Sequence, residues 1–236
     1  MEPTLAYAFR TPTPGRMVRL LGRIHPGVRT TGRQIVDHAD YWRSEAHRAL
    51  AGERPVLVAL GDSIAQGIGA STPEFGYVGL LSRQLQLPVL NLSRSGARLA
   101  DVLDEQLPAL AASAVETRAV ICTVGSNDLL RELRFTTTKR RMSQLVEVLP
   151  DQAILATLPD AGSLLAKRLN RHLRREAADH GRAIADVAAK LGSWRGLAAS
   201  DQFHPNDAGH RLWCHAFLGT LGIGMDHQPD GESREP

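Results

Sequence analysis

The sequence predicts an α/β fold, a three-layer α/β/α sandwich with a mainly parallel central sheet of about five strands. Two observations support this prediction. Five short apolar runs are separated by segments of helical length, and polar loops follow most of the runs. Strands that alternate with helices form parallel sheets, and helices then cover both faces of the sheet.

The five expected strands are short apolar runs, of which the last is the weakest. They are PVLVAL (55–60), LPVLNL (87–92), RAVICTV (118–124), QAILATL (152–158) and AIADV (183–187).

Four helices are expected between the strands, at 77–85, 99–112, 139–149 and 163–180. In the last of these, apolar residues at helical spacing predict the buried face. The other face is basic, and a solvated helix surface is favoured over an anionic partner because exposed helix faces are normally charged. The apolar stripe comprises Leu165, Leu169, Leu173 and Ala177, and the basic face Lys167, Arg168, Arg171, Arg174 and Arg175.

Extensions are expected at both ends of a single main domain. Residues 1–31 are rich in Pro, Gly, Thr and Arg, which predicts an irregular basic arm. Residues 33–50 have apolar side chains every three or four positions, which predicts an amphipathic helix packed on the domain or, alternatively, a mobile lid. The polar C-terminal end predicts a disordered tail. The chain is thus divided into 1–50 for arm and helix, 51–222 for the main domain and 223–236 for the tail.

The composition excludes several classes of protein. The chain has 236 residues, of which 43% are hydrophobic and 22% charged, as in an ordinary soluble globular protein. Its net charge is only +3 and aromatic residues are 5%, so nucleic-acid binding is not supported. No membrane-length apolar stretch and no signal-peptide pattern is present, so a cytoplasmic protein without a membrane span is expected.

The two cysteines do not indicate a disulfide or a metal site. Cys122 lies in an apolar run and Cys214 on the expected C-terminal helix, so both should be small buried side chains. The absence of CxxC or paired His/Cys spacing argues against structural zinc.

Polar residues follow four of the five expected strands. In an open α/β sheet, ligands bind beside the carboxyl ends of the parallel strands, so these loops are the candidate site. They are GDSIAQG from Gly61, NLSRSGA from Asn91, GSNDLL from Gly125 and DQFHP from Asp201.

The DQFHP loop has the features of an oriented base. Pro205 disfavours helical dihedral angles at His204, and Asn206 is a good N-cap for the helix that follows. Asp201 is close enough in sequence to hydrogen-bond one ring nitrogen of His204. This is how a general base is oriented.

A nucleophile for this base is available after the first strand. A serine hydroxyl reacts poorly until a neighbouring base takes its proton, and the oxyanion formed on attack needs hydrogen-bond donors. We expect Ser63 to be the nucleophile, His204 the base and Asp201 its orienting partner. Glycine lets the backbone approach a ligand, and an amide donates without adding charge, so the expected donors are the Gly96 N–H and the Asn127 side chain.

Taken together, the four loops resemble those of the SGNH hydrolase superfamily, the GDSL lipases and esterases, over about residues 55–220. The resemblance implies an SGNH/flavodoxin-like sandwich and a serine esterase that needs neither metal nor organic cofactor. It further implies that the Ser63 N–H is a third oxyanion donor and that Asp62 and Asp128 fix the loops. The chain departs from the pattern in reading GDSI for GDSL and in its long N-terminal extension.

The expected function is hydrolysis of a carboxylic ester with a small acyl or aryl group through an acyl-serine intermediate. The partner is then a small-molecule ester; the sequence does not predict an oligomeric state. Two alternatives remain: an acyltransferase or carbohydrate or natural-product deacetylase with the same triad, and a non-catalytic binding domain with this fold. The α/β-hydrolase fold is disfavoured, because Ala65 replaces the second glycine of G-x-S-x-G and no HGGG-type segment is present.

Overall fold

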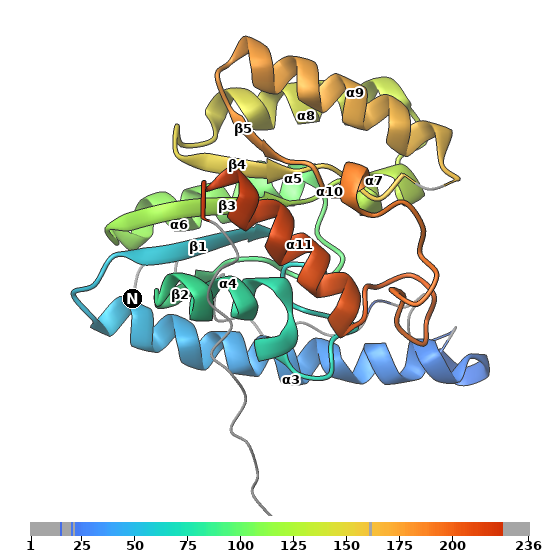
Figure 1. The fold of residues 1–236 in the computed structure, drawn as a ribbon, viewed down its shortest axis with the longest axis horizontal. Helices are drawn as coiled ribbons and strands as arrows, with labels where there is room; N and C mark the ends of the chain where they lie inside the picture. The colour runs from blue at the N-terminus through green and yellow to red at the C-terminus, as the bar shows by residue number, and fades with distance from the viewer. Residues whose placement is uncertain (1–14, 16–19, 21, 161, 224–236) are drawn as a thin grey trace, which may run out of the picture.

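The structure, a computed structural model, describes residues 15, 20, 22–160 and 162–223 (Figure 1). At its centre is a parallel five-stranded sheet with strand order β2-β1-β3-β4-β5. The predicted fold class is therefore confirmed, and each predicted apolar run contains a strand. The strands are β1 (Val56–Gly61), β2 (Val89–Asn91), β3 (Thr117–Thr123), β4 (Ala153–Ala156) and β5 (Ala183–Ala185).

Helices cover both faces of the sheet, and the side chains of β1 alternate between the two cores. Val58 and Leu60 point to the face covered by α5, α6, α8 and α9, whereas Leu57 and Ala59 point to the face covered by α4, α10 and α11. The bounds of these elements and of the short α7 are α4 (Tyr77–Leu85), α5 (Leu99–Asp101), α6 (Leu107–Ser113), α7 (Ser126–Arg131), α8 (Phe135–Val148), α9 (Leu164–Asp179), α10 (Val187–Lys190) and α11 (Asp207–Thr220).

A 26-residue helix, α3 (Pro26–Ala51), runs along the β2 side of the sheet (Figure 1). Its Trp42 packs into one core and its Ala46 into the other, so the helix lies between the two layers at the sheet edge. The expectation of irregular chain as far as residue 31 is wrong for residues 22–24 and 26–31, which are helical. Pro26 begins the helix, and the side chain of His25 caps it by accepting the Val28 N–H at 3.3 Å.

The expected fifth strand (183–187) is two residues too long. β5 ends at Ala185 because Asp186 caps α10, where its carboxylate accepts the Ala189 N–H at 3.2 Å. Local capping here outweighs the apolar pattern.

The expected helix 99–112 is interrupted. Between α5 and α6, the turn η2 (Val102–Gln106) is π-helical. Its last residue, Gln106, is fully buried and hydrogen-bonds both backbone groups of Gly61 at the end of β1: the Gly61 N–H to Oε1 at 2.7 Å and Nε2 to the Gly61 carbonyl at 2.9 Å. Such turns are frequent at functional sites.

The expected helix 163–180 corresponds to α9. Ser163 caps it by accepting the Ala166 N–H at 3.2 Å. Leu169, Leu173 and Ala177 are buried as expected, but Leu165 is 43% exposed. The apolar stripe therefore begins one turn later than its spacing indicates.

Among the described residues, no helix is both long and apolar enough to cross a membrane. Cys122 and Cys214 are buried and free, as expected. The division into 1–50, 51–222 and 223–236 stays a prediction. Residues 1–14, 16–19, 21 and 224–236, which contain most of the expected arm and tail, lie outside the described residues.

Candidate active site

The structure brings Ser63, His204 and Asp201 into one chain of hydrogen bonds. His204 Nε2 lies 2.9 Å from Ser63 Oγ, and His204 Nδ1 lies 2.6 Å from Asp201 Oδ2. Because a carboxylate can only accept, Nδ1 carries the proton and donates it to Asp201. In the neutral ring, Nε2 is then free to accept the hydroxyl proton of Ser63.

Asp201 is held as an anion. Its Oδ1 accepts the backbone N–H groups of Phe203 and His204, each at 3.0 Å. Burial alone would raise the pKa of Asp201, but the hydrogen bond and charge of His204 and these two N–H donors outweigh it and hold the pKa well below 3.8. An ionised Asp201 fixes the tautomer and orientation of His204.

The loop that carries His204 is fixed by local backbone contacts. The His204 carbonyl accepts the Ala199 N–H at 2.7 Å, and the Asn206 N–H donates to Leu197 at 2.8 Å. Asn206 caps α11 by accepting the Gly209 N–H at 3.0 Å, as predicted. His204 is thereby held at the start of a helix whose far face is buried in the core.

Ser63 lies in the turn that follows β1. Gly61 precedes this turn with φ +129°, and a Cβ there would lie 2.0 Å from the Thr123 carbonyl oxygen of β3. Only glycine fits both the dihedral angle and the close approach. Ser63 itself is 7% exposed.

The segment after Ser63 is hydrogen-bonded from one side by α3. Gln34 accepts the Gly69 N–H at 2.9 Å and donates to the Ala70 carbonyl at 2.7 Å. His38 Nδ1 and Trp42 Nε1 both donate to the Gln66 carbonyl, at 3.0 and 3.1 Å. Burial lowers the pKa of His38, which favours the neutral ring.

From the other side, α11 holds the same segment. His210 Nδ1 accepts the Tyr77 N–H at 3.3 Å, so Nε2 carries the proton and donates to the Ile68 carbonyl at 3.2 Å. Burial lowers the pKa of His210 to about 3. Asp207 accepts the backbone N–H and the hydroxyl of Ser71 at 2.7 and 2.8 Å. Residues 66–71 are thus clamped between two helices far apart in the sequence.

The loop after β2 is linked to the same segment. Asn91 Nδ2 donates to the Ala65 carbonyl at 2.9 Å. The Gln66 side chain donates to the Ser93 carbonyl and accepts the Ser95 hydroxyl, both at 2.9 Å. Gly96 follows directly, with φ +82°, a conformation that favours glycine.

Asn127 lies at the start of α7, against both neighbouring loops. Its amide donates to the Ala97 carbonyl at 3.0 Å and, more weakly, to Asp62 Oδ2 at 3.5 Å. Asp62 Oδ1 accepts the Ile64 N–H at 3.0 Å. All predicted site residues therefore meet at the carboxyl ends of β1, β2 and β3.

The two aspartates expected to support the loops are both buried. Burial raises the pKa of Asp62 to about 7. Burial also raises the pKa of Asp128, whose Oδ2 accepts the Leu99 N–H at 3.0 Å and whose Oδ1 has no hydrogen-bond partner among the described residues. Each carboxyl group therefore joins two chain segments, although burial makes its ionised form less favourable.

Several polar residues of the site's surroundings were missed by the sequence analysis. A pattern did exist for two of them: Gln34 and His38 are four residues apart on the face of α3 that also contains Trp42. No local pattern points to the rest, which are Gln66, Gln106, Asp207 and His210.

A model of the GDSL-like Lipase/Acylhydrolase family matches residues 59–212. The chain belongs to this family. It is an ester-hydrolysing serine hydrolase of the SGNH superfamily. In this GDSL hydrolase, α3 lies outside the matched residues. No curated protein gives a significant match to the sequence.

Solved structures share the fold of this GDSL hydrolase. TesA is 25% identical with a TM-score of 0.61, over 70% of this chain and 97% of that chain. A member of the lipolytic protein G-D-S-L family from Veillonella parvula DSM 2008 is 21% identical with a TM-score of 0.62, over 72% and 99%. Axe2, an acetylxylan esterase from Geobacillus stearothermophilus, is 20% identical with a TM-score of 0.56, over 73% and 96%.

No group of three or more His, Cys, Asp or Glu side chains in the described part of the chain is arranged to hold a metal ion. The expectation of a reaction without metal or organic cofactor stays a prediction.

Proposed function

We propose that this GDSL hydrolase cleaves small carboxylic esters through an acyl-enzyme on Ser63, with His204 as general base and Asp201 as its orienting partner. The observation that supports this most is the position of His204, whose two ring nitrogens lie 2.9 Å from Ser63 Oγ and 2.6 Å from Asp201 Oδ2. The base is thus within hydrogen-bond reach of the proton that it takes and is itself oriented.

In the first half-reaction, Ser63 Oγ attacks the ester carbonyl as His204 takes its proton. The tetrahedral intermediate collapses when His204 returns the proton to the leaving alkoxide, which departs as the alcohol. Water then attacks the acyl-enzyme as His204 takes one of its protons. The second tetrahedral intermediate collapses with cleavage of the bond between the acyl carbon and Ser63 Oγ, His204 returns the proton to Oγ, and the acid is released.

We assign the stabilisation of the oxyanion to three donors: the backbone N–H groups of Ser63 and Gly96 and the side-chain amide of Asn127. This amide donates to the Ala97 carbonyl and to Asp62 Oδ2. The oxyanion would replace the 3.5 Å contact with Asp62, which is the weaker of the two bonds. Asp62 would then act as a positioning residue, through its Ile64 N–H bond.

Hydrolysis of p-nitrophenyl acetate and butyrate by wild type, Ser63→Ala and Ser71→Ala tests the assignment. Ser71 lies on the same loop but bonds Asp207, so it is the matched control. Loss of at least about 10⁴-fold in kcat is expected for Ser63→Ala and only a few-fold change for Ser71→Ala. Equal rates of wild type and Ser63→Ala would contradict the proposal.

The same triad would also serve an acyltransferase or a deacetylase of carbohydrates or natural products. Product analysis with dilute added alcohol separates these: transesterification that dominates hydrolysis would identify a transferase. The cytoplasmic location and the absence of a nucleic-acid partner stay predictions.

A further inference from the structure

The outward side of α9 is rich in cationic side chains. At 3.6 residues per turn, Leu164, Arg168, Arg171 and Arg175 fall within about 60° of one another around the helix axis. Lys167, Arg171 and Arg175 are exposed and form no ion pair with any residue that the structure describes. The arginine beside them, Arg174, instead pairs with Asp186 at 2.7 Å.

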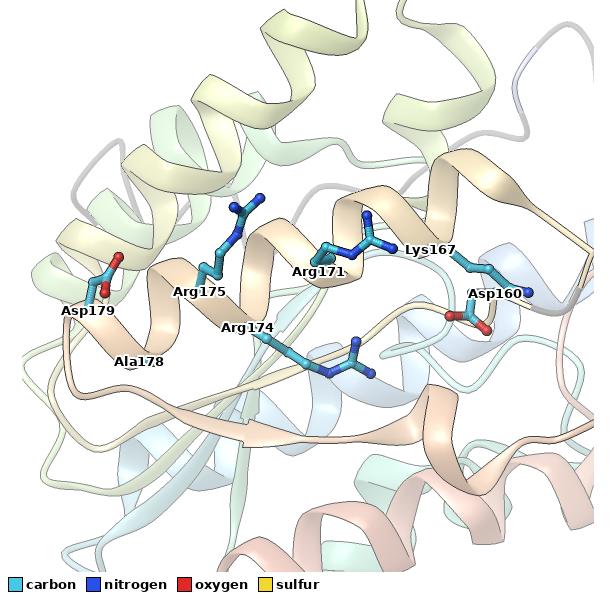
Figure 2. A pocket seen from close by; sticks show the side chains of 7 residues that line it. All are labelled: Asp160, Lys167, Arg171, Arg174, Arg175, Ala178 and Asp179. Carbon is cyan, nitrogen blue, oxygen red and sulfur yellow. The ribbon is translucent and has the colours of Figure 1, made fainter.

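A shallow groove of about 510 Å³ follows α9 and is lined by Asp160, Lys167, Arg171, Arg174, Arg175, Ala178 and Asp179 (Figure 2). Arg171 and Arg175 project to the same side of α9, whereas Arg174 projects to the opposite side, toward β5 (Figure 2). The carboxylates of Asp160 and Asp179 lie only at the two ends of the groove. Its middle is therefore positively charged.

Exposed leucines lie beside the cationic groove. Leu164 is 77% exposed and Leu165 43%, at the N-terminal end of α9. Leu130 is 66% exposed on α7, and Leu133, just after α7, is 99% exposed. Single exposed leucines are normal, but a group of them on adjacent helix ends is typical of an interaction surface.

The exposed leucines lie at the N-terminal end of the cationic side of α9. α7 lies next to the N-terminal end of α9 (Figure 1), and the Arg168 guanidinium lies 5.1 Å from the ring centre of Phe135, which begins α8. We name this surface the α7–α9 face. It comprises Leu130, Leu133, Leu164, Lys167, Arg168, Arg171 and Arg175.

The α7–α9 face adjoins the proposed active site. Leu130 follows Asn127 by one helical turn. The guanidinium of Arg131 lies 3.9 Å from the position that a Cβ on Gly96 would occupy. The helix α7 therefore links this face to Asn127 and to the loop that contains Gly96.

We propose that the α7–α9 face docks the protein reversibly on an anionic lipid surface. Aliphatic side chains gain free energy by leaving water for the headgroup and acyl boundary, and cations beside them are attracted to lipid phosphates. Nucleic acid fits less well, because the exposed apolar side chains are aliphatic and do not stack on bases. No helix needs to span the bilayer for this contact.

Co-sedimentation of the full chain with lipid vesicles tests the proposal without any substrate, so the outcome does not depend on the esterase assignment. Vesicles of equal parts phosphatidylglycerol and phosphatidylcholine should pellet the protein, and pure phosphatidylcholine should pellet far less. The combined variant Lys167→Gln, Arg171→Gln, Arg175→Gln should bind at least about tenfold more weakly. Salt should weaken wild-type binding by screening.

A matched control removes the same charge from scattered exposed positions: Arg118→Gln, Arg195→Gln, Arg211→Gln. It should bind as wild type within about threefold, because single surface charges far from the contact are screened. A second variant, Leu130→Ser, Leu133→Ser, Leu164→Ser, should lose the binding that persists at high salt. Thermal unfolding checks that all variants are folded.

Three results would contradict the proposal. The protein fails to pellet with the anionic vesicles, or the scattered control loses as much binding as the clustered variant, or the α7–α9 face binds a DNA duplex and not the vesicles.

Discussion

The segment after β1 and the segment after β3 both begin at the proposed active site, but they are held very differently. Residues 62–71 are almost entirely buried and are bonded by side chains from α3, from α11 and from the loop after β2. Residues 129–134 bond mainly within their own turn and expose Leu130 and Leu133.

This difference suits the two segments to different functions. A nucleophile works only when its base and oxyanion donors are placed within a fraction of an ångström, which requires a loop fixed from several sides. A surface that docks on lipid needs exposed side chains. Substitution of a buried side chain that positions Ser63, its base or its oxyanion donors should therefore change catalysis strongly, whereas substitution in residues 129–134 should change it weakly.

The largest effect is expected for Asp201→Asn. An asparagine can present its amide to His204 and favour the wrong tautomer, so kcat on p-nitrophenyl acetate should fall about 10⁴-fold with little change in KM. Steady-state kinetics at pH 8 measures this. A fall of less than tenfold in a folded variant would mean that Asp201 does not orient the base.

Asn127→Ala should lower kcat by about 10² to 10³, because it removes one donor to the developing oxyanion. Leu130→Ala, three residues along the same helix, is the matched control and should stay within about threefold of wild type on this soluble ester. Similar losses in both variants would show that α7 is disturbed as a whole.

Whether a feature of the fold or of the site could be predicted depends on how far apart in the sequence its residues lie. Buried parallel strands are continuous apolar runs, so all five were found, and Asp201, His204 and Asn206 lie within six positions and form a local pattern. The contacts from Gln34 to Ala70 and from His210 to Ile68 join residues 36 and 142 positions apart. No periodicity encodes such contacts, and the exposure of Leu165 likewise depends on which neighbours α9 meets.

His210 should make the fold sensitive to acid. Its pKa is lowered to about 3 in the folded protein, against an ordinary value of 6.5. Between these values the unfolded chain binds the proton and the folded chain does not, so the free energy of unfolding falls as pH drops from about 6.5 toward 3, by at most about 1.4 kcal/mol per pH unit.

Denaturant unfolding of wild type and His210→Gln between pH 4 and 7 measures this contribution, since glutamine keeps a donor and an acceptor but does not titrate. The variant should show a shallower pH dependence. An NMR titration of wild type, in which the His210 ring stays neutral above pH 4, gives the same answer without a variant; protonation near pH 6 would refute the prediction.

Gln34→Ala should have a smaller effect than Asp201→Asn, Asn127→Ala or His210→Gln. It leaves the Gly69 N–H and the Ala70 carbonyl without their partner, which costs about 1 to 3 kcal/mol of unfolding free energy. Gln34→Glu keeps the acceptor for Gly69 and should lose less, whereas Leu133→Ser, on the exposed segment, should change stability by under about 0.5 kcal/mol. Equal losses of unfolding free energy in Gln34→Ala and Leu133→Ser would contradict the claim that the first segment is held more firmly than the second.

The central claim is that His204 activates Ser63. Labelling with a fluorophosphonate, read by intact mass and peptide mapping, tests it most directly on wild type, Ser63→Ala and His204→Gln. The account predicts one label per chain on the peptide containing Ser63, none for Ser63→Ala and much slower labelling for His204→Gln. Labelling of Ser63→Ala at the wild-type rate, or of His204→Gln as fast as wild type, would contradict it.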